Sequence, residues 1–352
     1  MEGEIKNLSR VFAAVIGALC YCRLVSARLP KGKWRLISIS PALYAFAILP
    51  LYISSAFITA VTVFFITWLA SFKLLLFAFD HGPLASEPPK SPLSFVAVAA
   101  LPFKINAAAA AAAKKTKKLP LYLATEIPIS AVLISILCDY KEFMHPFLLL
   151  VAYCCLVFLL IEILVESSSK LVRAAAGVEL EPASDEPYLA ASLREFWGRR
   201  WNLTVNNILR DAVFRPVRAA AAAVAGRRTA AMVGVMAAFV VSGLMHELLF
   251  WYVSRAAPSW EMTMFFVVHG VCVVAEFGIK AALGEKKLPV LPWFVTGPAT
   301  VGFVIATSYW LFFPPLMRSG SDVRVIQEFR FAGEFLVGKI KEIWLHSCKK
   351  FS

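Results

Sequence analysis

The sequence is poor in charged residues and lacks the motifs of most soluble enzymes. Only 17% of its 352 residues are charged, whereas about a quarter is usual for a soluble domain. It contains no G-x-S-x-G nucleophile turn, no Walker loop for phosphates and no dinucleotide fingerprint. No histidine is followed four or five residues later by an aspartate. These absences exclude the commonest soluble hydrolase and nucleotide-binding architectures.

Cysteine is not arranged for a metal site or a disulfide framework. The chain has 7 cysteines, most of them in apolar runs, and no pair of Cys-x-x-Cys units. The sequence therefore indicates neither a zinc site nor a disulfide framework.

What the sequence does contain is long apolar runs, since 59% of the residues are hydrophobic. Continuous runs of about 20 apolar residues are typical of membrane-spanning helices, whereas barrel strands alternate over about ten residues. The fold class is therefore all-α, a polytopic bundle of about eight spans that forms a single domain over residues 1–352. The first run is predicted to be a membrane helix and not a cleaved signal peptide, because no small-residue cleavage site follows it. The predicted spans are 8–27, 36–56, 58–79, 119–138, 143–165, 230–252, 262–283 and 291–313.

Two further apolar stretches do not fit a span. Residues 92–103 are too few to cross a bilayer and include two prolines, which indicates an interfacial or re-entrant segment. Residues 326–347 mix apolar residues with Lys and Glu, which predicts an amphipathic helix at the surface.

The formal net charge of +13 is expected to reflect a basic cytosolic face against anionic lipid headgroups, and not nucleic-acid binding. Basic residues crowd the first and third loops, which makes that side cytosolic and places segment 166–229 on it. The basic tail after Phe313 then falls on the opposite side, in conflict with the same rule. The basic loop residues are Arg28, Lys31, Lys33, Arg35, Lys104, Lys114, Lys115, Lys117 and Lys118.

The segment 185–202 reads D-E-P-Y-L-A-A-S-L-R-E-F-W-G-R-R-W-N and predicts a helix that begins after Pro187. At about 100° per residue it would have one polar and one apolar face. It can be interpreted as an interfacial anchor, or as a site where Arg199 or Arg200 binds substrate phosphates. The polar face carries Ser192, Glu195, Arg199 and Asn202, and the apolar face carries Leu189, Leu193, Phe196, Trp197 and Trp201.

Two spans carry ionisable residues, which are costly in a bilayer and usually functional. The first contains S-G-L-M-H-E at 242–247, where Ser242 and Gly243 leave room beside His246 and Glu247 lies on the next face. A catalytic histidine and a neutral histidine bonded between helices both fit this pattern.

The second span carries His269, Cys272 and Glu276 on one face. Three ligands from one helix are a poor metal site, so a hydrogen-bonded network that supports the site is the preferred interpretation.

The strings E-P-Y-L-A-A-S-L-R-E-F-W-G-R-R-W-N, S-G-L-M-H-E and H-G-V-C closely resemble the plant wax ester synthases, a group within the membrane-bound O-acyltransferase superfamily. The N-terminal strings C-Y-C-R (20–23) and W-L-A-S-F-K-L-L-L-F-A-F (68–79) are similar to the same group. The resemblance therefore extends over nearly the whole chain.

This resemblance implies a tunnel through the bundle and a multi-pass protein of the endoplasmic reticulum membrane. It implies that His246 is the catalytic base and that Asn202 is the second catalytic residue. The expected partners are membrane lipids, acyl-CoA as co-substrate and a long-chain fatty alcohol or another lipid alcohol, with no cofactor and no nucleic acid. Trp197, Arg199, Arg200, Trp201 and Ser242 are expected to bind substrate, and Glu247, His269 and Glu276 to support the site.

Other acceptors and one other class of function stay open at this point. Relatives within the superfamily acylate sterols, or acylate or acetylate diacylglycerol, and the same motifs are expected in them. A membrane transporter would also carry intramembrane His and Glu, but it would show inverted repeats, which this sequence lacks. The acyl-chain length and the oligomeric state are not encoded in any pattern that the sequence shows.

Overall fold

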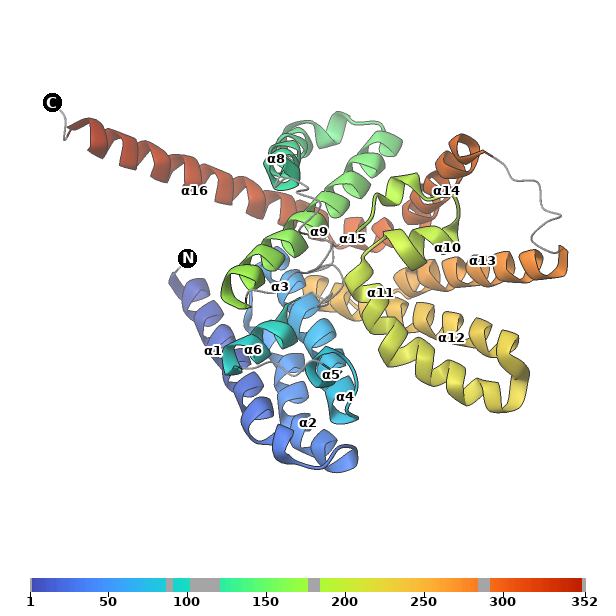
Figure 1. Cartoon of the computed structure of the whole chain (residues 1–352). Helices are drawn as coiled ribbons and strands as arrows, with labels where there is room; N and C mark the ends of the chain where they lie inside the picture. Colours follow the sequence, from blue (N-terminus) through green and yellow to red (C-terminus); the bar gives the residue numbers. More distant parts are fainter. Residues whose placement is uncertain (1, 87–90, 102–120, 177–183, 284–291, 350–352) are drawn as a thin grey trace.

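The computed structural model describes residues 2–86, 91–101, 121–176, 184–283 and 292–349, which form helices and no strand (Figure 1). Within these residues, 8 helical segments are long and apolar enough to cross a membrane. The prediction of an all-α, multi-pass membrane bundle is confirmed. The segments are Gly3–Arg28, Lys33–Tyr52, Ala56–Ala78, Leu123–Phe143, Pro146–Leu171, Leu203–Ser254, Glu261–Lys280 and Trp293–Arg318.

The N-terminal helices pack around one apolar core, and a π-helical turn interrupts the third span. A buried lysine fixes the short α6, because Lys73 Nζ donates to Val98 O at 2.7 Å and to Leu101 O at 2.5 Å. As predicted, α6 is too short to cross. The elements are α1 (Glu2–Leu24), η1 (Ser26–Arg28), α2 (Lys33–Ile48), η2 (Leu49–Tyr52), α3 (Ala56–Thr62), η3 (Val63–Ala70), α4 (Ser71–Ala78), α5 (Pro83–Ser86) and α6 (Pro92–Ala100).

A second core lies between the antiparallel helices α8 and α9 and the C-terminal elements that cover them. Leu150, Leu156 and Phe313 are among its buried side chains. The elements are α8 (Leu121–Tyr140), η4 (Lys141–Phe143), α9 (Pro146–Ala176), α13 (Glu261–Leu283), α14 (Trp293–Thr307), η8 (Ser308–Phe312) and α15 (Phe313–Arg318).

A helical hairpin forms from the end of the segment 166–229, which is predicted to be cytosolic, and the span that follows it. It runs through α11 (Leu203–Leu209), η7 (Arg210–Phe214) and α12 (Arg215–Ser254). The chain reverses inside α12 at Gly226, whose φ of 73° and ψ of 162° are readily adopted only by glycine. The hairpin therefore begins within the segment 166–229, and the alanine run 219–223 is part of its first arm. Alanine's high helix propensity accounts for this.

The register of this hairpin brings two distant residues to the same level. A side chain at Gly234 would meet the Phe214 ring at 2.9 Å, so these two positions lie opposite each other. Further along the two arms, Val205 of α11 and Met245 of α12 belong to one apolar cluster. The hairpin therefore packs the first turn of α11, which follows Asn202, against the part of α12 that carries His246.

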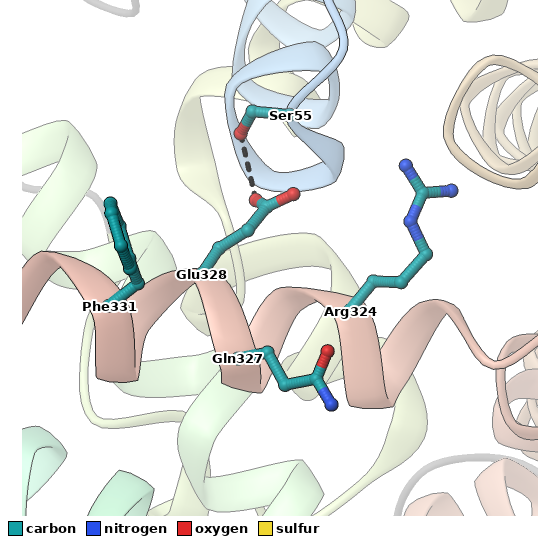
Figure 2. A pocket seen from close by; sticks show the side chains of 5 residues that line it. All are labelled: Ser55, Arg324, Gln327, Glu328 and Phe331. Atoms are coloured by element: carbon teal, nitrogen blue, oxygen red, sulfur yellow. Dashed lines mark hydrogen bonds between the residues drawn. The ribbon is translucent and has the colours of Figure 1, made fainter. Parts of the chain in front are cut away.

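Helix α16 (Ser321–Lys349) is anchored at its start and projects from the bundle (Figure 1). Glu328 accepts a hydrogen bond from Ser55 Oγ at 2.8 Å (Figure 2). It also accepts one from Ala56 N at 2.6 Å. A carboxylate at a helix N-terminus is favourable, so Glu328 caps α3. Further along α16, Phe331 and Trp344 are exposed. The amphipathic surface helix predicted from the sequence is present.

The turn at Gly226 is expected to face the cytosol, because Arg218, Arg227 and Arg228 lie close to it. Val224 is 89% exposed there and suits a probe. Val224→Cys, in a background without reactive native cysteines, should react with an impermeant thiol reagent in sealed, cytosolic-side-out microsomes. Reaction only after detergent treatment would contradict this orientation.

Candidate active site

His246 lies on the second arm of α12 with one ring nitrogen fixed by the backbone. Its Nδ1 is 2.7 Å from Ser242 O, one helical turn earlier. A carbonyl oxygen can only accept, so this contact requires the proton on Nδ1 and leaves Nε2 with its lone pair. No group in the described part of the chain hydrogen-bonds Nε2. The histidine is therefore held in the tautomer that a proton acceptor needs.

Aromatic rings from three other elements surround this imidazole. The Phe266 ring from α13 lies nearly parallel to it, with centroids 4.3 Å apart and an interplanar angle of 30°. The Trp68 ring from η3 is 5.0 Å away at 80°, and Phe312 from η8 is 5.9 Å away. Such apolar surroundings exclude water and disfavour the charged form of the ring.

His269 on α13 is fully buried, and both of its ring nitrogens have partners. Trp197 Nε1 donates to Nδ1 at 2.9 Å, and Nε2 lies 2.8 Å from Thr307 Oγ1. Because the Thr307 hydroxyl donates to Phe303 O at 2.8 Å, His269 Nε2 must be the donor to it. His269 therefore joins α13, α14 and η6 and has no free nitrogen.

The segment 185–202 is broken, and the prediction of one continuous helix is wrong. It consists of η5 (Pro187–Leu189), α10 (Leu193–Glu195) and the π-turn η6 (Phe196–Arg200). The Ser192 hydroxyl accepts from Glu195 N at 3.2 Å, and a Glu195 oxygen accepts from Ala191 N at 3.0 Å. This capping arrangement starts the helix at Leu193 and not directly after Pro187.

The predicted polar and apolar faces of this segment are also not maintained. Trp197, predicted on the apolar face, reaches inward to His269. Trp201 stacks on Phe196, with centroids 5.7 Å apart and an angle of 11°. The π-turn changes the residue period, so projections at 100° fail beyond residue 196.

Arg200 forms hydrogen bonds within the segment 185–202, whereas the side chain of Arg199 is exposed. Arg200 Nε donates to Glu195 Oε1 at 2.6 Å and Nη1 to Asp185 O at 3.0 Å. Partial burial alone would raise the pKa of Glu195, but hydrogen bonds from Ala191 N and Arg200 lower it overall. This stabilisation is present above the ordinary value of 4.5 and is lost as the pH falls through the lowered pKa. Of the described residues, none forms a hydrogen bond or ion pair with Arg199.

Asn202 has a structural role that the sequence did not reveal. Its φ of 40° is left-handed, a region that asparagine tolerates better than most residues. Its Oδ1 accepts from Val205 N at 3.2 Å and so caps α11. The amide nitrogen of this side chain has no hydrogen-bond partner among the described residues and is free to meet a substrate.

Gly243 and Glu247 lie at the contact between α12 and α13. A Cβ at Gly243 would lie 2.9 Å from Thr263 Cα, so this glycine permits close helix packing. The space expected beside Gly243 for a neighbouring helix or a ligand is thus filled by the neighbouring helix. Glu247 accepts from Trp260 N at 2.8 Å and from Thr263 N at 3.2 Å, so it caps α13 and does not orient His246.

The predicted network of His269, Cys272 and Glu276 does not form. Glu276 pairs with Lys280 Nζ at 2.6 Å and accepts from Arg194 N at 3.3 Å. A shared helix face fixes direction but not partners, and the partners of His269 come from other elements. In the described ranges no group of His, Cys, Asp and Glu is placed to hold a metal ion.

Two residues of this region escaped the sequence analysis. Trp68 lies next to His246, and Thr307 fixes His269. The W-L-A-S-F-K string drew attention to Trp68 only as part of a resemblance. A lone tryptophan or threonine in an apolar run carries no periodic signal that could have identified it.

Comparison with known proteins bears on the whole chain. Residues 180–268 match the profile of the Membrane bound O-acyl transferase family. The chain is 40% identical over 345 residues to probable long-chain-alcohol O-fatty-acyltransferase 3 of Arabidopsis thaliana, covering 96% of this chain and 98% of the relative. It is 40% identical over 338 residues to long-chain-alcohol O-fatty-acyltransferase of Simmondsia chinensis, covering 94% and 95%. It is 37% identical over 338 residues to acyl-CoA–sterol O-acyltransferase 1 of Arabidopsis thaliana, covering 93% and 95%.

Proposed function

Since the chain belongs to the membrane-bound O-acyl transferase family, we propose that it transfers a fatty acyl group from acyl-CoA to a long-chain alcohol and so forms a wax ester. Membership of this family favours an enzyme over the transporter considered from the sequence. The alcohol acceptor is supported by the names of two relatives that match nearly the whole chain.

The proposed chemistry rests on one observation. Nε2 of His246 has no hydrogen-bond partner among the described residues, and the Phe266 ring packs against the imidazole. In this proposal Nε2 takes the proton of the alcohol while the alcohol oxygen attacks the thioester carbon. The thiolate of CoA then leaves and takes this proton from His246. Both substrates bind together, so no covalent acyl-enzyme is required. General base catalysis of this kind contributes about 10²–10⁴-fold to a rate.

Asn202 is proposed to orient the thioester through its amide nitrogen while its oxygen caps α11. The apolar cluster that joins Val205, three residues after Asn202, to Met245 beside His246 supports this role. Trp197 and Trp201 line the same loop and are proposed to shape the substrate entrance. Ser242 acts through its carbonyl oxygen, which sets the tautomer of His246.

Arg199 is proposed to bind the phosphates of CoA, and Arg200 to hold the loop. Arg199→Ala should raise the KM for acyl-CoA about tenfold, the equivalent of one charged hydrogen bond, and leave the KM for the alcohol nearly unchanged. Arg194→Ala is the matched control, because Arg194 lies over the Phe277 ring at 4.5 Å. A lower kcat with unaltered KM in Arg199→Ala would contradict the proposal.

Acceptor assays test the proposed function directly. Microsomes that contain the protein should esterify a long-chain fatty alcohol faster than a sterol or diacylglycerol when several acyl-CoAs are offered. Preference for the sterol would favour the second candidate, which the 37% identical sterol acyltransferase supports. The same preparation tests location, since we propose that the protein resides in the endoplasmic reticulum membrane and meets acyl-CoA from the cytosol.

A further inference from the structure

Trp68 carries a buried hydrogen-bond donor without a partner. It is only 2% exposed, and its Nε1 finds no acceptor in the described part of the chain. Buried polar groups in folded proteins nearly always have partners, so each exception calls for an explanation. Trp197 shows the ordinary situation, because its Nε1 donates to His269.

The surroundings of Trp68 explain why no protein group meets this N–H. Its neighbours in the third apolar cluster include Leu69, Val205 and Ile208, and partly buried Met245 packs there too. Phe64 covers another side, with ring centroids 5.8 Å apart. None of these side chains offers an oxygen acceptor. The indole is therefore held firmly by apolar packing while its single polar atom stays free.

The position of Trp68 beside His246 indicates a function for its Nε1 donor. Its ring centroid lies 5.0 Å from that of His246 at an interplanar angle of 80°, so the indole that carries this N–H directly contacts the imidazole. Trp68 also belongs to the π-helical turn η3, and such turns are frequent at functional sites.

On the basis of the proposed function, we propose that Trp68 Nε1 donates to the thioester carbonyl oxygen and stabilises the oxyanion that forms on it. The alcohol oxygen bonds to the carbonyl carbon as its proton passes to His246 Nε2. The π electrons of the carbonyl move onto the oxygen, and a hydrogen bond from the indole N–H stabilises the negative charge there. When the C=O bond re-forms, the C–S bond breaks and the thiolate takes the proton from His246.

The carbonyl oxygen is a better acceptor for this donor than the alcohol oxygen. Indole N–H can only donate, and a thioester oxygen can only accept. The alcohol needs its lone pair for attack, so a donor placed on it would slow the reaction. Negative charge grows on the carbonyl oxygen, so a fixed donor there stabilises the transition state more than the bound substrate.

The test compares kcat and KM of purified full-length protein with hexadecanoyl-CoA and hexadecanol. Trp68→Phe, and benzothienylalanine introduced at position 68, should each lower kcat by ~10²-fold, as loss of one oxyanion donor does, with little change in either KM. Benzothienylalanine replaces N–H by sulfur and keeps the ring shape. The benzothienylalanine variant therefore still tests the proposal if Trp68→Phe fails to fold.

Trp251→Phe is the matched control, since Trp251 lies on α12 against Tyr252, with ring centroids 4.9 Å apart, and should leave kcat unchanged. A folded benzothienylalanine variant with wild-type kcat would overturn the proposal. That outcome leaves the wild-type protein active, whereas failure of the proposed function would leave the wild-type protein itself without wax ester synthesis.

Discussion

His246→Ala should lower the rate of ester formation by at least ~10²-fold, the minimum for loss of a general base. The reason is geometric, because, of the two histidines within the candidate membrane spans, His246 and His269, it is His246 whose Nε2 has no partner among the described residues. The measurement is wax ester formation at saturating substrates by protein that still inserts and elutes as a folded species. A smaller loss would mean that another group accepts the proton.

His269→Ala is the control, because it removes another buried histidine and leaves the proposed base in place. It removes the partner of Trp197 Nε1 and of Thr307 Oγ1, so the free energy of unfolding should fall by about 1–3 kcal/mol. Turnover should remain measurable in the folded fraction. A folded but inactive His269 variant, together with an active His246 variant, would exchange the two roles.

Glu247→Ala should destabilise the protein by about 3 kcal/mol. The carboxylate accepts from Trp260 N, Thr263 N and Thr263 Oγ1, and all three donors would lose their partner near the start of α13. The effect should appear as a lower Tm of the purified protein in detergent. Glu247→Gln should be intermediate, because its amide oxygen can still accept.

Glu276→Ala is the matched control for Glu247. Its partner Lys280 is half-exposed on the same helix, and such pairs contribute only about 0.3–0.5 kcal/mol. Its Tm should therefore change little. If Glu247→Ala keeps the wild-type Tm and yet abolishes turnover, Glu247 acts on the chemistry and not as a cap.

The sequence alone determined the class of the protein, the number of its spans and the residues that attract attention. In lipid every backbone group must be satisfied within the segment, so a run of about 20 apolar residues can only be a helix. Eight such runs predicted the eight candidate spans found among the residues that the structure describes. An ionisable residue in such a run is costly, which is why His246 and His269 were both found.

Only the tertiary structure decided which of these residues have partners. The period of a helix gives the direction of a side chain but not the group that it meets. The two nitrogens of His269 are bonded by Trp197 and Thr307, which lie 72 and 38 residues away in the chain. The π-turn η6 changed the local period, so the faces predicted for 185–202 were lost. Nothing local in the sequence records that Trp68 would meet His246 with its N–H unpaired, because that contact depends on how separate spans pack.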